Sequence, residues 1–126
     1  MIEGVRSVGI FVGDQDRAKD FYTTTLGFEL VQDTPMGEDA DAARWIEVSP
    51  PDRSVRLVLF TPEGQEDRIG TFSNVLFDCD DVPKTHEELT KRGVEFEDEP
   101  RREFWGWWAS FKDPDGNTYG LGQRGE

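Results

Sequence analysis

An internal repeat is the feature that most constrains how this 126-residue sequence can fold. The stretch Ser7–Asp14 aligns with Asn74–Asp81 at a constant offset, and each copy is a short run of alternating apolar residues that leads into aspartate. Alternation with a period of two is typical of a strand with one buried face. Because similar sequence units fold into similar structures, the sequence predicts two related modules in tandem.

The sequence predicts one helix after each of these strands. In the first copy, Asp14 or Asp16 would cap the helix and Gly27 would end it in the left-handed conformation. Its apolar stripe consists of Ala18, Phe21, Tyr22 and Thr25. In the second copy, a helix is predicted between Asp81 and Gly93, with proline in its first turn. That helix has a thinner apolar stripe, formed by Val82, His86 and Leu89.

Three short strands are predicted after each helix, and the last two of each set are joined by a turn rich in proline and aspartate. In the first copy the strands cover residues 28–31, 44–48 and 55–60. In the second copy they cover residues 94–96, 107–111 and 118–122. Three further segments read as surface loops: residues 33–43, 61–71 and 98–103.

The predicted fold class is therefore α+β, built from tandem βαβββ modules. We expect a single domain over residues 1–126, with the first module at 5–60 and the second at 72–123. Each helix should cover the outer face of a curved mixed sheet, which leaves the other face to be buried. We expect the two inner faces to line a common cleft, into which alternate strand residues point.

Four motifs in this order and spacing closely resemble the vicinal oxygen chelate superfamily, which includes glyoxalase I, extradiol dioxygenases, fosfomycin-resistance enzymes and bleomycin-resistance proteins. They are Asp-x-x-x-Ala-x-x-Phe-Tyr-x-x-x-Leu-Gly-Phe from Asp14, Asp80-Asp81-Val82, Gly93-Val94-Glu95-Phe96, and Asp113-Pro114-Asp115-Gly116-Asn117. The match covers essentially the whole chain. It implies paired βαβββ modules, usually in a homodimer, around a cavity that holds a divalent metal in the family's enzymes.

The resemblance also implies four metal-ligand positions, typically His, Glu, His and Glu. In this sequence they fall on Ser7, Val58, Asn74 and Gly120. None of these residues carries an imidazole or a carboxylate, and neutral hydroxyl and amide oxygens alone do not offset the dehydration of a divalent ion. The sequence therefore predicts that the family's metal centre is absent and that no cofactor is bound.

Other candidate catalytic residues are better explained by structural roles. His86 lies on the outer helix, away from the expected cleft, and Cys79 is followed by acidic residues that disfavour a thiolate. A calcium loop requires glycine at the position that follows the segment from Asp113 to Asn117, and this sequence has none there. The segment is therefore predicted to be a hairpin turn. No nucleophilic triad or phosphate-binding glycine motif is present.

Tryptophan residues provide the most distinctive candidate binding surface. Trp105 and Trp107 would share one face of a strand, with Trp108 on the other, so one of these two sets is expected to line the cleft or a subunit contact. Trp45 lies in the corresponding strand of the other copy. Large rigid aromatic side chains suit a flat or cationic ligand. Arg56 would face inward, where it could pair with Glu47 or hold an acidic group of the ligand. Alternatively, the tryptophans pack the sheet and a subunit contact.

The charge of the chain excludes two classes of partner. Its 27 acidic and 14 basic residues give a net charge of -13, which repels nucleic acid and anionic membrane surfaces. The same acidity could instead reflect a GC-rich genome or a salty cytoplasm. With one cysteine and no long apolar segment, the chain is expected in the cytoplasm.

Two functions are compatible with these features. In the first, the protein is a metal-independent binding protein, similar to bleomycin-resistance proteins, that sequesters a planar or cationic small molecule in an aromatic cleft. In the second, it is an enzyme of the same superfamily, a lyase, isomerase or dioxygenase, with a displaced metal site or none. Glu47 and Asp78 would then serve as base or ligand. Under either function we expect a homodimer with a small-molecule ligand.

Overall fold

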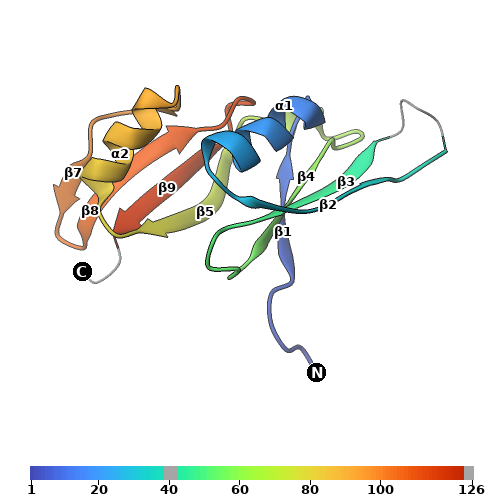
Figure 1. Ribbon diagram of the computed structural model, residues 1–126, viewed down its shortest axis with the longest axis horizontal. Helices are drawn as coiled ribbons and strands as arrows, with labels where there is room; N and C mark the ends of the chain where they lie inside the picture. The colour runs from blue at the N-terminus through green and yellow to red at the C-terminus, as the bar shows by residue number, and fades with distance from the viewer. Residues whose placement is uncertain (39–42, 124–126) are drawn as a thin grey trace. The chain divides into compact units, whose positions relative to one another are not determined.

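The computed structural model describes residues 1–38 and 43–123 (Figure 1). The chain divides into two compact units, with the boundary between Ile69 and Gly70. Each unit contains one sheet and one principal helix, and each is described here by itself. The α+β class is confirmed.

The first unit is a βαβββ module with a four-stranded sheet. Its strands follow the order β1-β4-β3-β2, in which β1 and β4 are parallel and the other neighbours antiparallel. The α-helix continues directly into a π-helical turn. The elements are β1 (Ser7–Phe11), α1 (Gln15–Asp20), the π-helix η1 (Phe21–Thr25), β2 (Glu29–Pro35), β3 (Arg44–Ser49), β4 (Arg56–Phe60) and the 3-10 helix η2 (Glu66–Arg68).

The helical segment formed by α1 and η1 begins and ends where the sequence predicts. The Asp14 side chain caps it by accepting a hydrogen bond from the backbone N–H of Arg17, and Gly27 adopts a φ of 79°. The Gln15 side chain fixes the helix to the sheet by donating to the backbone carbonyls of Arg44 and Leu59. The core between helix and sheet contains Ile10, Val12, Ala18, Phe21, Tyr22, Ile46, Val48, Leu57 and Leu59.

The second unit repeats this topology around a sheet of the order β5-β9-β8-β6, and an additional strand, β7, pairs with β8. Parallel pairing of β5 with β9 corresponds to that of β1 with β4. The elements are β5 (Phe72–Cys79), α2 (Val82–Lys91), β6 (Glu95–Phe96), β7 (Arg101–Glu103), β8 (Gly106–Lys112) and β9 (Thr118–Gln123).

Aromatic rings form the core beneath α2. Phe77 stacks on Tyr119 with ring centroids 4.8 Å apart, and Phe96 contacts Phe111 at 5.6 Å. The predicted turn between β8 and β9 is held by the buried Asp113 carboxylate. Its Oδ1 accepts hydrogen bonds from the backbone N–H groups of Asp115 and Asn117. The Asp113 carboxylate therefore stabilises the backbone of this turn.

Two segments predicted to be loops contain strand residues, and the reason is the same for both. Strand β2 continues to Pro35, into the segment predicted as a loop, because its polar residues pair with β3. There Asp33 accepts from both Lys19 and Arg44. Strand β7 also lies in a predicted loop, where it is formed by pairing with β8. Within the predicted loop at 33–43, residues 39–42 lie outside the described residues.

Helices in the described parts of the chain are short. None combines the length and the apolar character that a membrane-spanning helix requires.

Candidate functional site

The face of the first sheet opposite α1, called here the helix-free face, carries a polar cluster around Glu47. Trp45, Glu47 and Ser49 alternate along β3, and Val58 pairs with Glu47 from β4, so these side chains lie on this one face. Glu47 is only 6% exposed. The structure brings Trp45, Glu47 and Arg56 together, and Arg56 pairs with Glu47, which is one of the two roles that the sequence left open for it.

Three side chains donate hydrogen bonds to the Glu47 carboxylate. The Trp45 indole Nε1 and the Gln32 Nε2 donate to Oε1 at 2.7 and 3.2 Å. The Arg56 guanidinium donates to Oε2 at 3.1 Å. The Trp45 indole N–H, followed by the Arg56 guanidinium, holds the pKa of Glu47 below its ordinary value, although burial opposes this effect. Glu47 is thus a carboxylate that orients Trp45 and Arg56.

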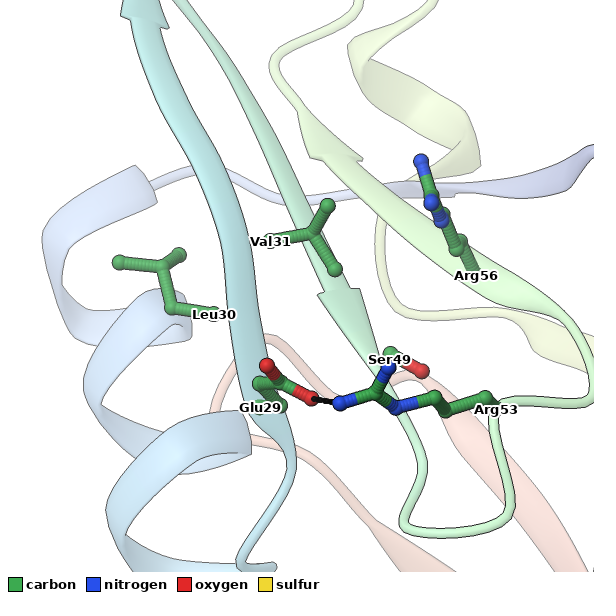
Figure 2. Close-up of a pocket in the computed structure, with 6 residues that line it drawn as sticks. All are labelled: Glu29, Leu30, Val31, Ser49, Arg53 and Arg56. Atoms are coloured by element: carbon green, nitrogen blue, oxygen red, sulfur yellow. Dashed lines mark hydrogen bonds and ion pairs between the residues drawn. The ribbon is translucent and has the colours of Figure 1, made fainter.

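A hollow of about 210 Å³ lies beside this cluster, also in the first unit (Figure 2). It is lined by residues of β2, of β3, of the turn into β4 and of β4 itself: Glu29, Leu30, Val31, Ser49, Arg53 and Arg56. At one end the Arg53 guanidinium donates to the Glu29 carboxylate at 3.1 Å. Arg56 borders both the hollow and the Glu47 cluster, so the two features adjoin on the sheet.

In the second unit, Trp108 is the tryptophan on the face opposite α2. It alternates with Ala109 and Phe111, which are buried on the α2 side, and its six-membered ring lies over Gly120 of β9. A Cβ at Gly120 would stand 2.3 Å from the Trp108 Cη2 atom. Only glycine therefore permits this contact.

The expected placement of Trp105 and Trp107 on one strand face was wrong. Trp105 lies in the turn between β7 and β8, next to Phe104, because β8 begins only at Gly106. Trp107 belongs to the face of Ala109, on the α2 side, and the Arg102 guanidinium lies 5.9 Å from its ring. The sequence places Trp108 on the strand face opposite Trp107, but Trp108 was not selected as a binding residue, although a glycine in the neighbouring strand is a signal of close contact.

The four positions that correspond to the family's metal ligands do not fit a divalent cation. Val58 is buried and apolar, and Gly120 is covered by Trp108. Asn74 has a φ of 64° at an irregularity in β5, so it departs from regular strand geometry. Ser7 offers one hydroxyl. Over residues 1–38 and 43–123, no three His, Cys, Asp or Glu side chains are grouped as a metal site requires.

The remaining candidate residues, His86, Cys79 and Asp78, lie on α2 and β5 of the second unit. His86 lies on α2 with its ring 4.5 Å from that of Phe96, in agreement with the predicted packing role. The Cys79 thiol donates to the carbonyl of Gly122 at 3.4 Å. Asp78 is exposed on β5.

Comparison with known proteins shows one family over nearly the whole chain. The model of the Glyoxalase/Bleomycin resistance protein/Dioxygenase superfamily matches residues 4–121. The protein YetH of Bacillus subtilis (strain 168) is 36% identical over 119 residues, which is 94% of this chain and 97% of YetH.

Two solved structures are similar over almost their full lengths. A member of the same superfamily from Sphaerobacter thermophilus DSM 20745 is 34% identical, with a TM-score of 0.86 and 98% of each chain covered. TnmS3, an antibiotic binding protein from Streptomyces sp. CB03234, is 37% identical, with a TM-score of 0.82, over 97% of this chain and 96% of TnmS3.

Proposed function

The chain belongs to the Glyoxalase/Bleomycin resistance protein/Dioxygenase superfamily, and on that premise we propose that it binds and sequesters a planar or cationic small molecule without a metal. Trp45, on the helix-free face of the first sheet, and Trp108, on the face of the second sheet opposite α2, would each provide a stacking surface within its own unit. We propose further that it acts in the cytoplasm as a homodimer. TnmS3, a relative of similar length, is an antibiotic binding protein, which supports a binding function.

The observation that carries this proposal is the contact of Trp108 with Gly120. At a position where the family's enzymes hold a metal-ligating carboxylate, this chain has no side chain, and an indole ring lies there instead. An aromatic ring fixed against a sheet is a surface for stacking, because little conformational entropy is lost when a ligand binds to it. Trp45 is similarly fixed through its hydrogen bond to Glu47.

The alternative function, an enzyme that uses Glu47 as a base, is less well supported. A general base at neutral pH works best with a pKa near 7. The pKa of Glu47 is shifted in the opposite direction, and both of its oxygens already accept hydrogen bonds. If the enzyme function were correct, Glu47→Gln would abolish turnover of an identified substrate while ligand binding remained.

The proposal is tested with N-phenyl-1-naphthylamine, a neutral aromatic probe whose fluorescence rises on binding. We expect Trp45→Ala and Trp108→Ala each to weaken its affinity by about tenfold, which corresponds to about 1.4 kcal/mol. Fluorescence titration of the purified protein gives these dissociation constants, and circular dichroism verifies that the variants are folded.

Trp107→Ala is the matched control, since this side chain lies on the α2 side of the same strand. We expect it to leave the affinity unchanged. An equal loss in Trp107→Ala would instead favour the binding residues predicted from sequence. Retention of full affinity in both Trp45→Ala and Trp108→Ala would contradict the proposal. So would one tightly held metal ion per subunit in native mass spectra recorded after addition of zinc, nickel, manganese or iron(II).

A further inference from the structure

The hollow beside the Glu47 cluster has two arginines and an apolar wall. Val31 and Arg56 lie on its two sides, and the Arg53 side chain reaches across one end toward Glu29 (Figure 2). Ser49 is buried in β3, and its hydroxyl donates to the carbonyl of Pro50. The hollow is therefore charged at one end and apolar along one side, as a site for an amphipathic molecule would be.

Arg53 closes the turn between β3 and β4, where its backbone N–H donates to the Pro50 carbonyl, in a conformation that favours glycine. Its φ is 57°, in the left-handed region where a non-glycine residue is strained. Its ion pair with Glu29 is exposed, with side-chain exposures of 75% and 58%, and exposed pairs contribute little to stability. Glycine would adopt this conformation without strain. Arginine at this position places its guanidinium at one end of the hollow.

Both guanidiniums have donors available for a ligand. Among the interactions of the described residues, Arg53 uses one nitrogen for Glu29 and Arg56 uses one for Glu47. A guanidinium has five N–H donors, and its planar arrangement suits carboxylate, sulfonate and phosphate groups. Arg56 is half-exposed, and Arg53 is largely exposed. The remaining donors can therefore reach an anion that enters the hollow.

We infer that the hollow binds an oxyanion group of the small-molecule ligand, with Arg53 and Arg56 as donors and Val31 against the adjoining apolar part. This inference rests on the proposed binding function and specifies the ligand class: a planar molecule that carries a carboxylate, sulfonate or phosphate. Trp45 and Ser49 are four residues apart on β3, about 13 Å. Arg56 is closer to the indole than this, because both side chains donate to the Glu47 carboxylate, so a ligand of two or three fused rings can reach from the indole to Arg56.

Two probes with the same aromatic framework test this inference. 8-Anilinonaphthalene-1-sulfonate differs from N-phenyl-1-naphthylamine by one sulfonate group. We expect the protein to bind the sulfonate probe about tenfold more tightly, as a charge-assisted interaction predicts. Arg53→Gly and Arg53→Gln should each remove most of this difference, while the affinity for the neutral probe remains. Because glycine relieves the strain, Arg53→Gly should also unfold at the same or a higher temperature.

Lys91→Gln is the control, since Lys91 also forms an exposed ion pair, with Glu87 on α2. It should leave the affinities for both probes unchanged. Equal affinity of the unmodified protein for both probes would overturn the inference, as would retention of the difference in both Arg53 variants. In either case, loss of neutral-probe binding in Trp45→Ala would leave the proposed function standing. A different result would contradict the proposed function instead: the affinity for the sulfonate probe falls in the Arg53 variants, while the affinity for the neutral probe is unchanged in Trp45→Ala and Trp108→Ala.

Discussion

Gly120→Ala is expected to destabilise the protein by about 1–3 kcal/mol, the usual cost of inserting a methyl group into a packed site. The new Cβ would stand 2.3 Å from Trp108 Cη2 and 2.8 Å from Cζ2, so the indole must move. For a chain of this length the loss corresponds to roughly 3–5 °C per kcal/mol in the unfolding midpoint. Thermal and urea unfolding, followed by circular dichroism, measure it.

Gly122→Ala is the control, because it lies in the same strand and a Cβ there would meet no atom within 4 Å. We expect its stability to equal or slightly exceed that of the unmodified protein, since alanine restricts the unfolded chain. In the Trp108→Ala background, Gly120→Ala should cost almost nothing. A cost for Gly120→Ala that is independent of Trp108 would show that the contact is not the cause.

Glu47→Gln is expected to reduce the free energy of unfolding by about 1–3 kcal/mol at pH 7, the range for hydrogen bonds to a buried charged group. The glutamine keeps the shape of the side chain but cannot accept from Trp45, Gln32 and Arg56 together. Part of the contribution from Arg56 is screened, since that side chain is 51% exposed. Urea unfolding at pH 7 provides the comparison.

The pH dependence of this difference follows from the lowered pKa of Glu47. Folding favours the ionised carboxylate, so its stabilisation is complete above the ordinary value of 4.5 and disappears as pH falls through the lower folded pKa. The difference between the two proteins should therefore be constant near neutrality and shrink in acid. Glu29→Gln, which breaks an exposed pair with Arg53, should show little effect at any pH. A difference that grows in acid would contradict the assignment.

Local signals accounted for most of the fold. The Asp14 cap, Gly27 and the turn that begins at Asp113 were predictable because each depends on a few neighbouring residues. The repeat then implied that both modules share one topology, and the two sheets have the same strand order. Strand β7 and the end of β2 were not predictable, since pairing partners distant in the sequence stabilise them.

The candidate site was predictable only in part. The common face of Trp45, Glu47 and Arg56 follows from alternation along β3 and β4, because the predicted limits of both strands are close to the observed ones. Alternation also places Trp107 and Trp108 on opposite faces. Which of these faces lies against α2 depends on how the helix packs, because the apolar residues of β8 are compatible with both.

By itself, the sequence determined the repeated βαβββ order and the absence of metal-ligand side chains at Ser7, Val58, Asn74 and Gly120, because residue identity and local spacing decide both. Only the tertiary structure decided that Glu47 is held as an ion by three donors, and that Trp108 lies on Gly120. Those properties depend on distances between side chains of different strands, and strand pairing fixes such distances.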